Sequence, residues 1–116
     1  MFNLGRRKEP RLREIRSVGE CSRVLEEDFA IIFKHSTLCD LSQAAHREVL
    51  DFCETHESAP VYLVSVIDYP EVTRHIAEKT AVSHESPQVI ALRKGEVVGA
   101  ASHRRVTAAL LNRLSA

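Results

Sequence analysis

The sequence predicts an α/β domain built on a central mixed sheet, with a parallel βαβ unit, an antiparallel hairpin and helices on both faces. Two observations support this prediction. Phe29–Lys34 and Val61–Asp68 are short runs rich in apolar residues, typical of buried strands, and a helical pattern lies between them. Gln88–Arg93 and Glu96–Ala101 also have strand character and are joined by only a tight turn. A helix between two buried strands indicates parallel strands with a right-handed crossover.

The domain is expected to begin with a strand and a helix. Leu12–Arg16 is assigned to a short strand. Val18–Asp28 is assigned to a short amphipathic helix, because Cys21 and Val24 recur at helical spacing. The next segment, Phe29–Lys34, starts with five apolar residues and therefore suits a strand that is covered on both faces.

The longest helix is expected from Asp40 or Leu41 to about His56. Its apolar residues form one stripe, which is expected to face the sheet. The members of this stripe are Leu41, Ala44, Ala45, Val49, Phe52 and Cys53. Pro60 ends the connection that follows, and Val61–Asp68 is the second buried strand.

The remaining elements follow recognisable turn residues. Pro70 is expected in the first turn before a helix over Glu71–Thr80. Lys94 and Gly95 form the tight turn of the hairpin, and Thr107–Leu114 is the last helix. The predicted order is therefore β-α-β-α-β-α-β-β-α.

Composition indicates an ordinary globular protein, and we assign one domain to residues 12–116. Hydrophobic residues make up 44% and charged residues 28%, and 16 basic side chains are balanced by 16 acidic ones. Because no overall field favours nucleic acid or an anionic membrane, we expect neither as a partner. Residues 1–11 are basic with little to bury, and we expect a flexible segment there.

The sequence has no feature of export or membrane insertion. No apolar run approaches the about 20 residues that span a bilayer, and the first residues lack the apolar core of a signal peptide. Cys21, Cys39 and Cys53 fit neither a disulfide framework nor a zinc pattern. We therefore expect a cytoplasmic protein with reduced thiols. The six histidines are scattered over different elements, so no metal site is expected.

Cys39 has the clearest chemical signal. It follows an apolar strand and stands where the longest helix begins. In the first turn of a helix, unpaired N–H groups and the positive end of the helix dipole stabilise a thiolate, which is the nucleophilic form of cysteine. Cys53 lies about 20 Å further along the same helix, so the two cannot form a disulfide. Cys21 and Cys53 are expected to be core residues.

Three segments resemble a known family. FKHSTLCDLS, HESPQVIALRKGEVV and ASHRRVTAALL are similar, in this order, to segments of the YtxJ-like family, the monothiol bacilliredoxins of the bacillithiol system. The predicted element order is also that of the thioredoxin architecture, so the resemblance implies a thioredoxin-like fold. The family usually reads Cys-Pro-Ile-Ser at its active site, where this chain has Cys39-Asp40-Leu41-Ser42.

The resemblance implies a monothiol exchange reaction without a metal or organic cofactor. Cys39 attacks a mixed disulfide between a client protein and a low-molecular-weight thiol such as bacillithiol, and the client cysteine leaves reduced. A second small thiol then releases Cys39, because Ser42 occupies the position of the second cysteine of a CxxC motif. The expected partners are therefore S-thiolated client proteins and the small thiol, which acts as a co-substrate.

The same resemblance implies a docking surface for the client. A cis Ser86–Pro87 bond presents the backbone of Ser86 to an extended substrate, which pairs with it like an added strand. Thr37 and Leu38 form the rim of this surface. The alternative is a trans loop proline before a strand.

Supporting residues are assigned around Cys39. The Asp40 carboxylate disfavours a neighbouring thiolate by repulsion but is favourable at a helix N-terminus, so two effects compete. We expect Lys34 and His35 to offset part of this charge. Ser42 is expected to bond to the sulfur or to cap the helix. His103 is expected to orient a loop or a substrate carboxylate.

Two other functions stay open at this point. One is a glutaredoxin-like enzyme that uses glutathione, although the Cys-Gly-Phe-Ser signature of one such class is absent after Cys39. The other is a non-catalytic thioredoxin-like module that binds proteins, in which Asp40 has suppressed the reactivity of the thiol.

Overall fold

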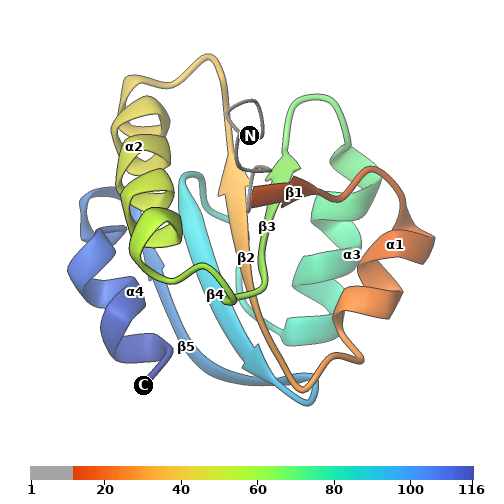
Figure 1. The fold of residues 1–116 in the computed structure, drawn as a ribbon. Coiled ribbons are helices and arrows are strands. Elements are labelled where there is room, and N and C mark those ends of the chain that lie inside the picture. The colour runs from red at the N-terminus through yellow and green to blue at the C-terminus, as the bar shows by residue number, and fades with distance from the viewer. Residues whose placement is uncertain (1–11) are drawn as a thin grey trace, which may run out of the picture.

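Five strands form one mixed sheet at the centre of the structure (Figure 1). The computed structural model describes residues 12–116, so the basic segment expected at residues 1–11 lies outside the described residues. The strands are β1 Leu12–Glu14, β2 Phe29–His35, β3 Val61–Ser65, β4 Gln88–Arg93 and β5 Glu96–Ser102. Their order is β1-β3-β2-β4-β5; the first three are parallel, whereas β4 and β5 each run antiparallel to the preceding neighbour. The predicted mixed sheet is confirmed.

Helices cover both faces of this sheet. In the described part of the chain they are α1 Val18–Val24, α2 Asp40–Thr55, α3 Pro70–Thr80 and α4 Ala108–Leu114, with a 3₁₀ turn at His103–Arg105. Figure 1 shows α2 and α4 on one face and α1 and α3 on the other. Successive residues of a strand point to opposite faces. Accordingly, Ile31 and Phe33 of β2 pack in the layer under α2, and Ile32 packs in the layer under α3.

The central strand β2 connects the two halves of the chain. It pairs with β3 in parallel, with Ile31 opposite Val61, and with β4 in antiparallel fashion, with Lys34 opposite Gln88. Its carboxyl end leads into α2. In open α/β sheets this is the edge at which ligands bind, outside the carboxyl ends of the parallel strands.

Three elements end earlier than the sequence pattern predicts. Strand β1 stops at Glu14 rather than Arg16, before Ser17 caps helix α1. Helix α1 stops at Val24 rather than Asp28, because Glu26 to Asp28 place negative charge at the helix C-terminus, where the dipole opposes it. Strand β3 stops at Ser65, whose hydroxyl bonds both the backbone N–H and the carboxylate of Asp68. These bonds favour a turn over three further strand residues.

The hairpin and the last helix show two backbone constraints. Lys94 and Gly95 both have positive φ, 52° and 81°, which is the conformation of the tight hairpin turn that the sequence predicts. Gly99 on β5 lies under α4, and a Cβ atom there would collide with the side chain of Leu114. A glycine therefore allows α4 to approach the sheet closely.

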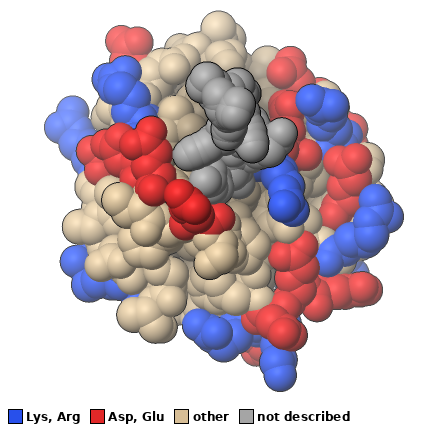
Figure 2. All heavy atoms as spheres, in the orientation of Figure 1, with Lys and Arg blue, Asp and Glu red and all other residues tan. Residues whose placement is uncertain are grey.

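Charges of both signs are spread over the described surface. On the face shown in Figure 2, basic side chains lie beside acidic ones and a broad uncharged area separates the groups. One exposed ion pair joins Arg16 and Glu14 at 3.0 Å. Within residues 12–116, no helix is both long enough and apolar enough to cross a membrane.

Candidate active site

Cys39 is the N-cap residue of α2 and is partly exposed. Its backbone is extended (φ −118°, ψ 124°), and its carbonyl oxygen accepts hydrogen bonds from Ser42 N at 3.0 Å and Gln43 N at 3.1 Å. The side chain makes no capping hydrogen bond, so the sulfur remains available at the positive end of the helix. Cys21 and Cys53 are buried, and no disulfide joins the three cysteines.

The loop before Cys39 is exposed but held in place. Leu38 is 84% exposed, so almost all of its apolar side chain is in contact with solvent. Its N–H donates to Ser36 Oγ at 3.3 Å, and Gln43 Nε2 donates to the carbonyl oxygen of Thr37 at 3.0 Å. Thr37 and Leu38 therefore lie in an exposed, hydrogen-bonded loop directly before Cys39.

Ser42 lies one turn into α2 and is fully buried. Its hydroxyl accepts a hydrogen bond from Ser36 N at 2.9 Å and shares another with His35 Nδ1 at 2.9 Å. The N-cap residue is Cys39, so Ser42 is not the cap. Instead, Ser42 fixes the end of β2 against the first turn of α2.

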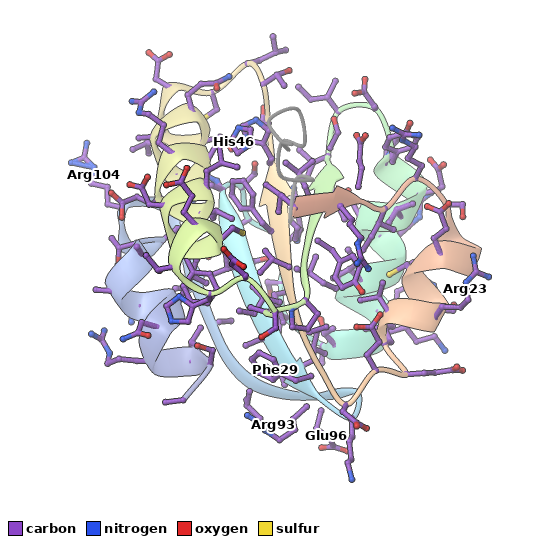
Figure 3. All side chains as sticks on the ribbon, in the orientation of Figure 1. Arg23, Phe29, His46, Arg93, Glu96 and Arg104 are labelled. Atoms are coloured by element: carbon purple, nitrogen blue, oxygen red, sulfur yellow. The ribbon has the colours of Figure 1, made fainter. Side chains whose placement is uncertain are left out.

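His35 lies on the α2 face, where its ring contacts His46 with a centroid separation of 4.6 Å. Figure 3 shows His46 projecting from α2 towards β2. Burial lowers the pKa of His35, neighbouring His46 lowers it further, and the hydrogen bond with Ser42 acts in the opposite direction. Burial also lowers the pKa of His46. Both imidazoles thus favour the neutral form, and His35 does not supply the counter-charge expected for Asp40.

Lys34 also differs from its expected role. Lys34 lies on the same face of β2 as Ile32, opposite to the face of His35, and it is fully buried. Its Nζ donates a hydrogen bond to Gln88 Oε1 at 2.8 Å. Burial lowers the pKa of its ammonium group to about 8, although nearby Glu85 raises it. The structure therefore brings Lys34 to β4 and not to Asp40.

Ser86 and Pro87 lie directly before β4, beside the end of β2 that leads into the Cys39 loop. The Ser86–Pro87 peptide bond is cis, and Pro87 directly precedes Gln88, which is opposite Lys34 in the β2–β4 register. Continued by one residue, this register places Pro87 next to His35. Ser86 is partly exposed, yet its Oγ atom is buried without a hydrogen-bond partner in the described part of the chain.

His103 meets the same segment through its backbone. Its N–H donates to the carbonyl oxygen of Pro87 at 2.8 Å, while its side chain is exposed. The residue has a φ of 59°, in the left-handed region that few non-glycine residues adopt. His103 thus connects the end of β5 to the segment before β4.

Two hollows lie near the ends of α2. A groove of about 210 Å³ runs between the start of α2 and the chain after β5, where Leu41, Glu48, His103 and Thr107 are among its lining residues. Arg104 borders it, and Figure 3 shows this side chain pointing outwards. A hollow of about 620 Å³ lies at the other end, near Phe29, far from Cys39 along α2.

Several contact residues of the site were not found from the sequence. They are Ser36, Gln43, His46, Gln88 and Ser102. Of these residues, Gln88 could have been suspected from the sequence, because it is a polar residue at the start of an apolar strand pattern. Within residues 12–116, no cluster of three or more His, Cys, Asp or Glu side chains could hold a metal ion.

A cysteine at the N-terminus of the helix after a central parallel strand, together with a cis-proline directly before an antiparallel neighbour of that strand, defines a thioredoxin-fold protein. The comparisons with known proteins agree. The family model for the monothiol bacilliredoxin BrxC matches residues 12–111, and the chain belongs to this family. Family and fold together make it a thiol-disulfide oxidoreductase.

Solved structures support the same fold. A structure described as having a thioredoxin fold is 25% identical, with a TM-score of 0.85, and the match covers 90% of this chain and 94% of that one. Thioredoxin from Trypanosoma brucei brucei is 17% identical, with a TM-score of 0.76, and covers 95% and 92%. Thioredoxin from Malassezia sympodialis is 13% identical, with a TM-score of 0.74, and covers 96% of each chain.

Proposed function

We propose that this protein removes a low-molecular-weight thiol, bacillithiol in this family, from mixed disulfides with client proteins. The observation that supports this function most directly is the position of Cys39. Its sulfur is the partly exposed one of three, it lies at the N-terminus of α2, and the residue one turn later is a buried serine. Such a site exposes one thiol to a substrate and has no second thiol with which to close a disulfide, as a monothiol mechanism requires.

The reaction has two balanced exchange steps. The Cys39 thiolate attacks the sulfur of the small thiol in the mixed disulfide, so a Cys39–small-thiol disulfide forms and the client leaves as a thiolate. A second small-thiol thiolate then attacks the small-thiol sulfur of that disulfide. Cys39 leaves as a thiolate, and the two small thiols form a symmetrical disulfide. No metal or organic cofactor takes part, and the small thiol is a co-substrate.

The client is proposed to dock on the loops beside Cys39. Leu38 offers an exposed apolar contact, and Thr37 continues the rim. The backbone of Ser86 and Pro87 lies on the other side of the end of β2, where an extended client segment can pair with it. His103 supports this edge through its bond to Pro87. The reducing cytoplasm is the compartment we assign to this chemistry.

The first test compares three proteins, which are the wild type, Cys39→Ser and Cys21→Ala. Each reacts with a peptide whose cysteine is capped by bacillithiol, glutathione or cysteine, and release of the peptide thiol is followed by mass spectrometry. We expect Cys39→Ser to lose at least about 100-fold in rate, because the nucleophile is absent. Cys21→Ala is the matched control, since that thiol is buried in the other layer of the core.

The capping group identifies the co-substrate. The proposal is supported if the peptide thiol is released fastest from the bacillithiol-capped peptide. Fastest release from the glutathione-capped peptide favours the glutathione-dependent alternative. The pH dependence of Cys39 alkylation separates catalysis from simple binding. A midpoint below the about 8.5 of a free cysteine indicates a catalytic thiolate, whereas slow labelling with a higher midpoint contradicts the proposal and favours a binding module.

A further inference from the structure

Three polar residues form a row across the sheet on the face that α1 and α3 cover. Lys34 of β2 lies opposite Gln88 of β4, and Gln88 lies opposite Ser102 of β5. The residues that precede or follow them on the same face, such as Ile32 and Ile90, belong to the apolar layer. Lys34 is 0% exposed and Gln88 is 2% exposed. A buried lysine is costly, so this row needs an explanation.

The amide of Gln88 joins three separate segments. Its Oε1 accepts from Lys34 Nζ at 2.8 Å, and its Nε2 donates to the carbonyl oxygen of Ser83 at 3.1 Å and to Ser102 Oγ at 3.2 Å. One side chain therefore connects the end of β2, the end of β5 and the loop between α3 and β4. If Lys34 were apolar, the buried Oε1 atom would lose this donor.

The loop that Gln88 contacts is the docking segment, defined here as residues 83–86. It has no helix or strand of its own, and with the residues that the structure describes it makes no backbone-to-backbone hydrogen bond. Two of its residues lie near Lys34, since Glu85 attracts the ammonium group and Lys34 contributes, after burial, to the lowered pKa of His84. The bond from Gln88 to Ser83 therefore anchors a segment that regular structure does not hold.

We propose that Lys34 and Gln88 are positioning residues, which hold the docking segment against the sheet so that Ser86 presents its backbone beside Cys39. The proposal rests on the proposed function, in which an extended client pairs with Ser86. Lys34 fixes the orientation of the Gln88 amide, because its Nζ can only donate and so selects Oε1. The amide nitrogen then faces Ser83 and Ser102. Without this arrangement the segment moves, and client binding weakens while the chemistry at Cys39 is unchanged.

Two variants separate positioning from stability. Gln88→Glu keeps an acceptor for Lys34 but has no N–H to donate to Ser83. The double variant Lys34→Met and Gln88→Met replaces both partners by apolar groups of similar size, which avoids a buried polar group without a partner. Tyr62→Phe is the matched control. It removes the hydrogen bond that the Tyr62 hydroxyl donates to Glu27, on the same face of the sheet but away from residues 83–86.

The first measurement is backbone NMR relaxation of the intact chain, which needs no substrate. We expect the order parameters of residues 83–86 to fall from about 0.85 in the wild type and Tyr62→Phe to below about 0.6 in both test variants. The order parameters of β2 and β3 are expected to stay at the wild-type value. Unchanged order parameters in the docking segment of both variants would overturn the proposal, whatever the activity.

The second measurement is exchange kinetics with two substrates. With a small-thiol-capped peptide, we expect KM to rise about tenfold and kcat to stay within about twofold in both variants. With a small symmetrical disulfide, which needs no docking segment, the rate is expected to stay within about twofold. Wild-type KM in the stably folded double variant contradicts positioning and indicates a purely structural role. If the wild type reacts with none of the disulfides, the proposed function is refuted. The order parameters then still test whether Lys34 and Gln88 hold the docking segment in place.

Discussion

At the scale of single residues, the last two side chains of β2, Lys34 and His35, have structural partners. His35 bonds Ser42 and contacts His46, and Lys34 bonds Gln88 on the other face of β2. Neither is placed as a counter-charge to Asp40. The polar groups of α2 nearest to Cys39 are therefore the unpaired backbone N–H groups of its first turn.

His35 makes stability depend on pH. Its pKa is lowered in the folded protein, so the unfolded chain binds the proton first as the pH falls below the usual histidine value of about 6.5. The free energy of unfolding therefore decreases as the pH falls, because the unfolded state binds more protons than the folded state. We expect His35→Asn to lose less stability than the wild type between pH 7 and pH 5.5. Urea unfolding at the two pH values measures this, and an equal loss in both proteins contradicts the assignment.

At the scale of elements, the site is made by the junction between β2 and α2. Ser42 holds this junction through Ser36 and His35, and Gln43 holds the exposed loop through Thr37. Both residues lie in the first turn and a half of α2, so the helix itself fixes the loop that precedes it. Asp40 occupies the first position of the helix, where its charge favours the helix but opposes a neighbouring thiolate.

Asp40→Asn separates these two effects. Removal of the negative charge is expected to lower the free energy of unfolding by about 0.5 kcal/mol, because a favourable charge at the helix N-terminus is lost. The same change is expected to raise the rate of Cys39 alkylation at pH 7 about threefold, because repulsion of the thiolate is relieved. Urea unfolding and alkylation kinetics measure the two effects. A slower alkylation rate in the variant would show that the carboxylate assists the thiol.

At the scale of the whole molecule, the sequence patterns were sufficient for the fold and for the place of Cys39. Apolar runs and turn residues depend on local chemistry, which is why β2, α2 and the hairpin were found. The partners of Lys34 and His46 were not found, because they depend on strand register and on the rotation of α2 against the sheet. The length of α1 was overestimated for a similar reason, since a helical pattern does not show where the chain must turn back.

Protonation of the buried Lys34 makes the free energy of unfolding of the whole protein depend on pH. Its pKa is lowered by burial from 10.5 to about 8, so between these values the unfolded chain holds a proton that the folded protein has released. The unfolded state binds more protons in this window, and Lys34 therefore adds stability as the pH rises from about 8 towards 10.5, by up to about 3 kcal/mol.

The wild type and Lys34→Met are compared by urea unfolding at pH 7.5, 8.5 and 9.5. The difference isolates Lys34 from other groups, such as the Cys21 thiol, whose pKa is raised to about 11 by burial. We expect the wild type to gain stability relative to the variant over this range. A constant difference between the two proteins contradicts the linkage.

The strand order has a consequence for how the protein becomes active during synthesis. Cys39 belongs to the part of the chain before α3, whereas Ser86, Pro87 and His103 come after it, and the two parts meet along β2 and β4. A nascent chain that has emerged from the ribosome only as far as α3 contains the thiol but no docking edge. In the proposed function, client docking therefore requires both parts of the chain, and the site is complete only when the hairpin has been added.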